Sequence, residues 1–362
     1  MVGHRAEKAL ADCLARNCPP AQEVEASLQA SVELFADGRY TDAQRTLQKA
    51  IRRNRDKAAQ MPGPVSSLYA TLATVAEHQG DRDLWLSSAR NNMLVLQRHL
   101  GETHKATLVQ ELAFADNMVG LGKSDAAADI YHRVQRKAAA DGQTDLAAGA
   151  AFRRAWLASL LERDGEAERI AGEAVALAGG SNTIMLELRD ILRARVAIRR
   201  GDDGAVDALA DRIRQSPTKA PKLLYARPVD DLNSKLVSLD PRNQGGVRFA
   251  DVGYWIRPDG RTRGVEVLRT SGLGQWGPAI LRQVSGRRYA PLDAQPDWPG
   301  MYRIDRFTVR QAIGKPVGSF IRRRAGNYSV HIIDLTETDA MTVANRERTQ
   351  QDMPALTDEN PS

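Results

Sequence analysis

Apolar and polar positions in the first two thirds of the chain alternate with the 3.6-residue period of an α-helix. Between residues 22 and 215, small and aliphatic side chains return every three or four positions, and single glycines interrupt the pattern. The interruptions fall at Gly38, Gly80, Gly122, Gly165 and Gly201, with spacings of 42, 42, 43 and 36 residues. A fixed period in this range is typical of helix–turn–helix units stacked into a solenoid. We therefore expect residues 22–216 to form a helical repeat array.

The turn around Gly38 shows the chemistry of one unit most clearly. We expect Gly38 to end the first helix, because the residue after a helix often needs a positive φ. Tyr40 can fill the space between the two helices, and Ala43 is small enough for the helices to cross closely. The same turn recurs at Gly122, with alanines at positions 126 and 127.

These turns resemble those of the tetratricopeptide repeat, which read Gly-x-Tyr/Phe-x-x-Ala. The segment Leu100–Leu108 is similar to the linker of the longer repeats in kinesin-light-chain-like arrays. The resemblance covers about 190 residues, with two departures. Trp85 replaces the small alanine of the second unit, and the turn at Gly165 is displaced by a residue. The resemblance implies a curved scaffold with a concave surface for peptides or partner domains.

After residue 216 the period changes from helical to alternating. Residues 217–244 contain several prolines and predict a linker, with one strand near residues 223–226. From residue 245 onward, apolar residues recur at every second position and predict a strand up to Ile256. Pro258-Asp259-Gly260 predicts a tight turn, and a second strand then runs over 262–270.

The second strand ends at Ser271-Gly272 and is followed by an amphipathic helix from about Trp276 to Ser285. A third strand is expected over Tyr302–Val309. The order strand, turn, strand, helix, strand predicts a small α+β domain, so the whole chain is expected to be an α+β multidomain protein. Gly326-Asn327 lies between two alternating runs and predicts a further hairpin turn.

This order of elements resembles the C-terminal domain of TonB-type energy transducers. The shared features are Asp259-Gly260 after the first strand, Ser271-Gly272 after the second, Ala279-Ile280 in the helix, and Arg287–Pro291 after it. Such transducers begin with a membrane anchor and a long spacer, whereas here the repeat array precedes the domain. The resemblance therefore implies peptide binding more than energy transduction.

In that family, an extended peptide of an outer-membrane receptor binds by strand addition, so the resemblance implies a TonB-dependent receptor as partner. We expect the third strand to be the free edge. Its candidate binding residues are Tyr302, Arg303, Ile304, Arg306 and Phe307. Arg303 and Arg306 would point outward and suit an acidic peptide.

Charge is distributed unevenly along the chain. The net charge is +6, from 51 basic and 45 acidic residues. Residues 245–324 hold 15 basic and 6 acidic residues, or +9, and residues 325–362 hold 2 basic and 7 acidic residues, or −5. A basic domain leaves nucleic-acid binding open as an alternative, although we expect no nucleic-acid partner. A purely structural scaffold without any ligand is a second alternative.

The two cysteines lie close together near the start of the chain. Cys13 and Cys18 are five positions apart and could form a disulfide, or could be two unrelated small core residues. A pair in an otherwise cysteine-free chain is typical of an oxidising compartment, so we expect a periplasmic protein. Residues 1–9 contain no apolar run of the kind a signal peptide needs. No window is apolar enough to predict a transmembrane helix.

No catalytic motif accompanies these elements. The sequence lacks Gly-x-Ser-x-Gly, a phosphate-binding loop and any His/Glu pair with metal-ligand spacing. We therefore expect no enzyme activity, no cofactor and no metal. The predicted organisation is a segment with the cysteine pair (1–21), the repeats (22–216), a linker (217–244), the β domain with its C-terminal extension (245–336) and a flexible polar tail (337–362).

Overall fold

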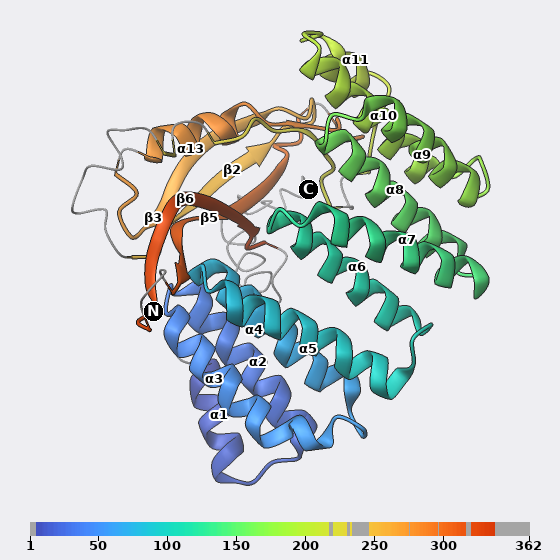
Figure 1. The fold of residues 1–362 in the computed structure, drawn as a ribbon. Helices are drawn as coiled ribbons and strands as arrows, with labels where there is room; N and C mark the ends of the chain where they lie inside the picture. The colour runs from blue at the N-terminus through green and yellow to red at the C-terminus, as the bar shows by residue number, and fades with distance from the viewer. Residues whose placement is uncertain are drawn as a thin grey trace, which may run out of the picture.

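The computed structural model combines a curved array of helices with a small antiparallel sheet (Figure 1). It describes residues 5–216, 220–229, 232–233, 246–274, 276–295, 297–315 and 320–336. The expected tail over 337–362 and most of the linker lie outside the described residues. The helices of the array are α1 (Arg5–Ala15), α2 (Pro20–Ala36), α3 (Tyr40–Asn54), α4 (Pro62–Gln79), α5 (Arg82–Leu100), α6 (Lys105–Gly120), α7 (Ser124–Ala140), α8 (Thr144–Leu160), α9 (Asp164–Leu177), α10 (Thr183–Arg199) and α11 (Ala205–Ala210), with a 3₁₀ turn over Arg55–Lys57.

Consecutive helices from α2 onward pair across short turns, which confirms the predicted helical repeats. Gly38, Gly80 and Gly122 each have a φ between 73° and 77° at the turn inside a pair, and Gly201 has a φ of 96°. The prediction for Gly165 is wrong, because Gly165 lies in the first turn of α9. The left-handed residue of that turn is Glu162, with a φ of 60°. The array is therefore TPR-like, with one pair whose turn carries no glycine.

Small side chains let the paired helices approach each other. Ala43 is fully buried where α3 crosses its neighbours, and Tyr40 fills the adjacent space beside Phe35 at a ring-centroid distance of 5.0 Å. Trp85 packs among alanines of α4 and α5 and lies beside Gly120 of α6. The large side chain of the second unit is thus packed mainly against small residues.

The sheet contains the strands β2 (Arg248–Ile256), β3 (Thr262–Thr270), β5 (Met301–Gly314) and β6 (Arg323–Asp334), in the order β3-β2-β5-β6. Helix α13 (Trp276–Ser285) follows β3, which confirms the predicted order of strand, strand, helix and strand. The prediction of a hairpin at Gly326-Asn327 is wrong, because both residues lie inside β6 beside an irregularity in its pairing with β5.

Side chains alternate between the two faces of this sheet. Val252 and Tyr254 of β2 pack with Trp276 and Ile280 of α13 in one cluster. Phe249 of β2 points the other way, into a cluster built mainly by α2, α3 and α4. The sheet therefore lies between α13 and the first helix pairs of the array (Figure 1).

A second contact joins the sheet domain to the far end of the array. The strand predicted near residues 223–226 is β1 (Leu223–Tyr225), which pairs with β4 (Arg288–Tyr289). The backbone N–H of Gln215 donates to the carbonyl of Pro291 at 3.0 Å, and the Arg288 Nε lies 3.0 Å from an Asp207 carboxylate oxygen. The sheet domain thus contacts both ends of the curved array.

The N-terminal helix α1 packs on α2 and is closed by a disulfide. Cys13 lies at its buried face and is bonded to Cys18, with a Cα–Cα distance of 5.1 Å. This pairing confirms the disulfide reading of the two cysteines over the reading of two unrelated core residues. No helix among the described residues is both long and apolar enough to cross a membrane.

Gly80 and Gly122 offer a matched test of the contact between array and sheet. Both have a φ near 74°, but an added Cβ meets nothing at Gly122, whereas at Gly80 it would lie 2.6 Å from the carbonyl oxygen of Gln311. Gly80 also accepts a hydrogen bond from the Ile313 N–H at 2.7 Å. Gly122→Ala should lower the free energy of unfolding by roughly 1–2 kcal/mol through backbone strain alone.

Gly80→Ala should cost at least about 1 kcal/mol more, because β5 must also move away from the turn and its hydrogen bond is weakened. Urea denaturation of both variants measures the difference. Equal losses in the two variants would contradict a tight contact between this turn and β5.

Candidate functional site

The strand expected to be a free edge lies inside the sheet. β5 pairs with β2 along Met301–Val309 and with β6 along Asp305–Gly314, so the prediction of an edge at Tyr302–Arg310 is wrong. The side chains of Ile304, Arg306 and Phe307 are buried. The physical reason is β6, which covers the side of β5 where a peptide was expected to add.

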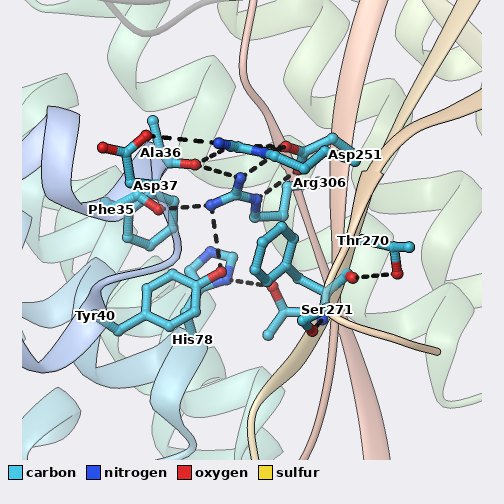
Figure 2. A network of polar contacts seen from close by, with 12 residues as sticks. Phe35, Ala36, Asp37, Tyr40, His78, Asp251, Thr270, Ser271 and Arg306 are labelled. Atoms are coloured by element: carbon cyan, nitrogen blue, oxygen red, sulfur yellow. Dashed lines mark hydrogen bonds and ion pairs between the residues drawn. The ribbon is translucent and has the colours of Figure 1, made fainter. Parts of the chain in front are cut away.

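Arg306 points into the array rather than outward to solvent (Figure 2). Its guanidinium forms two bonds with Asp251 at 2.6 and 2.7 Å. It also donates to the backbone carbonyls of Phe35 and Ala36, both at 2.6 Å, and to the Tyr40 hydroxyl at 3.3 Å. A fully buried charge of this kind is tolerated only when it is paired and its donors are satisfied.

The carbonyls that Arg306 binds are those at the C-terminal end of α2. The last carbonyls of a helix have no partner within the helix and carry the negative end of its dipole, so a cation is favoured there. Arg269 of β3 reaches the same end of α2 through the Ala36 carbonyl and also pairs with Asp251. We call Arg306, Arg269 and Asp251, with the α2 end that they contact, the docking network.

The end of α4 is bound in the same way one repeat further on. Arg310 of β5 donates to the Glu77 carbonyl at 2.9 and 3.1 Å. Arg324 of β6 donates to the Gln79 carbonyl at 2.6 Å. The sheet therefore supplies arginines to two successive helix ends of the array.

Two histidines lie beside these arginines. His78 of α4 is fully buried, and its Nδ1 lies 2.9 Å from the Thr308 hydroxyl. His331 of β6 packs edge-on against it, with ring centroids 4.5 Å apart, and its Nε2 lies 2.9 Å from a Glu77 carboxylate oxygen. Burial, with His331, Arg310 and Arg306 nearby, holds the pKa of His78 well below its usual value.

Burial also shifts the phenol that faces the same space. The pKa of Tyr40 is raised, because burial disfavours its charged form more than the nearby Arg306 favours it. His78 and Tyr40 are therefore both neutral at physiological pH. The docking network gathers no metal-binding set, and the described residues contain no group of three His, Cys, Asp or Glu side chains that could hold a metal ion.

The remaining predicted motif residues are structural. Gly260 has a φ of 78° in the turn at Asp259-Gly260, which joins β2 to the antiparallel strand β3. Its carbonyl accepts a hydrogen bond from the Tyr289 N–H at 2.8 Å. The Ser271 hydroxyl accepts from the Phe249 N–H at 2.8 Å, and Gly272 has a φ of 92°. These residues shape the hairpin.

An open cleft lies next to the docking network, between β6 and the second and third helix pairs. It encloses about 520 Å³. Its lining combines apolar side chains, cations and the backbone of β6: Glu77, Gly80, Arg82, Trp85, Gly120, Leu121, Arg310, Ala312 and residues 326–331. Arg82 and Arg310 outnumber Glu77, the one acidic side chain of the lining, so the lining is cationic overall.

Residues 326–331 of β6 line one side of this cleft, and Asn233 pairs with the outer edge of the same strand. The Asn233 side chain accepts from the N–H of Tyr328 at 2.7 Å and donates to the carbonyl of Tyr328 at 2.9 Å. This amide therefore occupies the position of a neighbouring strand. Because backbone groups alternate along an antiparallel strand, the N–H and carbonyl groups of Val330 and Ile332 point the same way. Among the described residues, none bonds to the backbone of these two on that side.

The sequence contained a signal for this edge. The alternating run from Tyr328 to Leu335 predicted a strand, but the Gly326-Asn327 pair was interpreted as its turn. The role of Asn233 had no signal, because a single asparagine in a polar linker has no pattern around it. Asn233 and Tyr328, which bond to each other at this edge, are 95 residues apart in the chain.

Comparisons with known proteins find only distant structural similarity. No family model matches the chain, and no curated protein matches it. BtubC (BKLC) from P. vanneervenii aligns with a TM-score of 0.45 and 16% identity, covering 62% of this chain and 96% of that one. A structure of kinesin light chain TPR-like repeats from Podosopora anserina aligns with a TM-score of 0.42 and 12% identity, covering 53% of this chain and 93% of that one.

A third similar structure is Rap protein complexed with competence and sporulation factor. It aligns with a TM-score of 0.37 and 14% identity, covering 53% of this chain and 52% of that one. Scores this low support no functional argument, so the function is argued from the geometry of this chain alone.

The buried His78 predicts a loss of stability in mild acid. Its pKa is lowered in the folded protein, so between that value and about 6.5 the unfolded chain binds a proton that the folded chain does not. The groups around it are Tyr40, Glu77, Arg306, Arg310 and His331. The free energy of unfolding should therefore fall below pH 6.5, by up to about 1.4 kcal/mol per pH unit from this group.

Urea denaturation between pH 7.5 and 5.5 measures this slope. His78→Gln should flatten it, whereas the control His132→Gln, at an exposed position on α7, should leave it unchanged. If wild type and His78→Gln show the same slope, His78 is not the group that lowers the free energy of unfolding in mild acid.

Proposed function

We propose that this protein is a non-enzymatic interaction scaffold that holds an extended peptide in the cleft beside β6. The peptide adds as a further strand to the outer edge of β6, and the helix pairs form the opposite wall. The observation that carries the proposal is the outward backbone of Val330, which lies in the cleft lining, and of the adjoining Ile332. Neither has a partner on that side among the described residues.

Strand addition fits this edge because one side chain already pairs with its backbone as a neighbouring strand would. Asn233 gives Tyr328 both hydrogen bonds that a neighbouring strand would give, which shows that this side of β6 can be paired. Main-chain pairing provides affinity, and pockets for alternate side chains provide specificity. Trp85 and Leu121 offer an apolar wall for one set of peptide side chains.

The cleft has little freedom to change shape. The docking network, with the two sheet arginines that bind the end of α4, ties the sheet to the helices on which the opposite wall is built. A preformed groove lowers the ordering cost of binding, because only the peptide has to become ordered. The array in this proposal is the wall and support of the binding site.

We extend the proposal to the compartment and the partner. The disulfide between Cys13 and Cys18 favours an oxidising compartment, for which the periplasm is our proposal. The order β2, β3, α13, β5 supports a TonB-like domain, and the partner class is then the periplasmic segment of a TonB-dependent outer-membrane receptor. The binding edge in this proposal is that of β6, since β6 covers the side of β5 where the peptide was expected to add.

The alternative of a nucleic-acid-binding domain loses its main support. That alternative depends on clustered arginines at the surface, which would contact phosphates. Arg306, Arg310 and Arg324 instead donate to helix carbonyls, and Arg287 is buried against Asp305. Much of the basic charge of the sheet domain is therefore used inside the molecule.

Proline at position 332 tests the proposed edge. Ile332 directs its N–H away from β5, so Ile332→Pro removes an outward donor without removing a ladder hydrogen bond. The probes are fluorescent 12-residue peptides that tile the periplasmic segments of outer-membrane receptors, with binding measured by anisotropy. Ile332→Pro should weaken any peptide that binds by about tenfold or more.

Asn233→Ala is the matched variant with the opposite expectation. It frees the backbone of Tyr328 for the peptide, so affinity should stay the same or rise. If no peptide binds wild type, or if Ile332→Pro binds as well as wild type, the proposal of strand addition at β6 is wrong. Circular dichroism of both variants checks that the sheet is intact.

A further inference from the structure

The connection between β5 and β6 exposes two adjacent apolar side chains. The side chain of Phe320 is 96% exposed and that of Ile321 is 75% exposed. Among the described residues, the next most exposed large apolar side chain is Ile184, at 62%. Two consecutive side chains this exposed add nothing to the apolar core of the described residues, and apolar surface of this kind indicates an interaction.

Basic residues flank this apolar pair along the chain. Lys315 and Arg323 are exposed, and neither forms an ion pair within the described chain. Arg322 follows Ile321 and is paired with Asp81 and Asp83. Lys315 and Arg323 therefore leave two positive charges without a carboxylate partner among the described residues.

The base of the hairpin is fixed to the array. The Ile313 N–H donates to the Gly80 carbonyl at 2.7 Å, and the Arg322 guanidinium donates to Asp81 at 3.1 Å. Both partners belong to the turn between α4 and α5. Ile313 and Arg322, which lie on either side of the connection, are therefore both attached to the array.

We propose that Phe320 and Ile321 insert into the surface of an anionic phospholipid bilayer, with Lys315 and Arg323 contacting its headgroups. Interfacial anchors combine apolar side chains with basic residues in this way. A stable protein interface takes about 800 Å² from each partner, which two side chains at a hairpin end do not supply. A bilayer needs no complementary pocket and accepts a small apolar protrusion. The proposal is independent of peptide binding in the cleft.

Vesicle flotation with the full chain tests this proposal. The probes are vesicles of phosphatidylcholine with 30% phosphatidylglycerol, and vesicles of phosphatidylcholine alone. Wild type should float with the anionic vesicles and much less with the neutral ones, and 0.5 M salt should weaken the binding. The double variant Phe320→Ser/Ile321→Ser should lower the partition coefficient by about tenfold or more, because each apolar side chain is lost from the interface.

Ile184→Ser is the matched control, since it removes an exposed apolar side chain on α10, away from the hairpin. It should bind vesicles like wild type, and Lys315→Glu/Arg323→Glu should lose binding to anionic vesicles. Denaturation midpoints confirm that all variants fold. Absence of wild-type flotation, or an equal loss in Ile184→Ser and the hairpin variant, would overturn the proposal. Equal binding to neutral vesicles would overturn the role of the cations.

Discussion

The fold depends on one buried cation. Arg306 is shared between Asp251 of its own sheet and the carbonyls of Phe35 and Ala36 at the end of α2. A guanidinium without these partners could not be buried, and Asp251 without its arginines would be an unpaired buried carboxylate. The sheet and the array therefore satisfy each other's polar groups. Without the other part, each surface would lose these hydrogen-bond partners.

The same chemistry explains the charge distribution. The segment 245–324 has a net charge of +9, which suggests an external acidic partner, but several of its arginines face helix ends. Helix C-termini carry partial negative charge that composition does not count, because it comes from the backbone and not from side chains. Net charge calculated from sequence therefore overestimates the positive charge that this domain presents to solvent.

Sequence reasoning predicted the elements well and their neighbours poorly. The helical period and the glycines at 38, 80 and 122 located most of the repeats, since a positive φ at a helix end is a local requirement. Glu162 took that role without glycine and displaced one predicted turn. Alternation identified β5 as a strand, but which strands flank it is decided by residues distant in sequence, so β6 and Asn233 could not be placed.

The sheet domain touches the array at both ends, at α2 and α4 through arginines and at Asp207 and Gln215 through the segment around Arg288. Most solenoids are open, and their length can drift in evolution through gain or loss of whole repeats. Here an inserted helix pair would separate the two attachment points and break one of them. The number of repeats is consequently limited by the distance that the sheet domain spans. A change in the length of one part would require a matching change in the other.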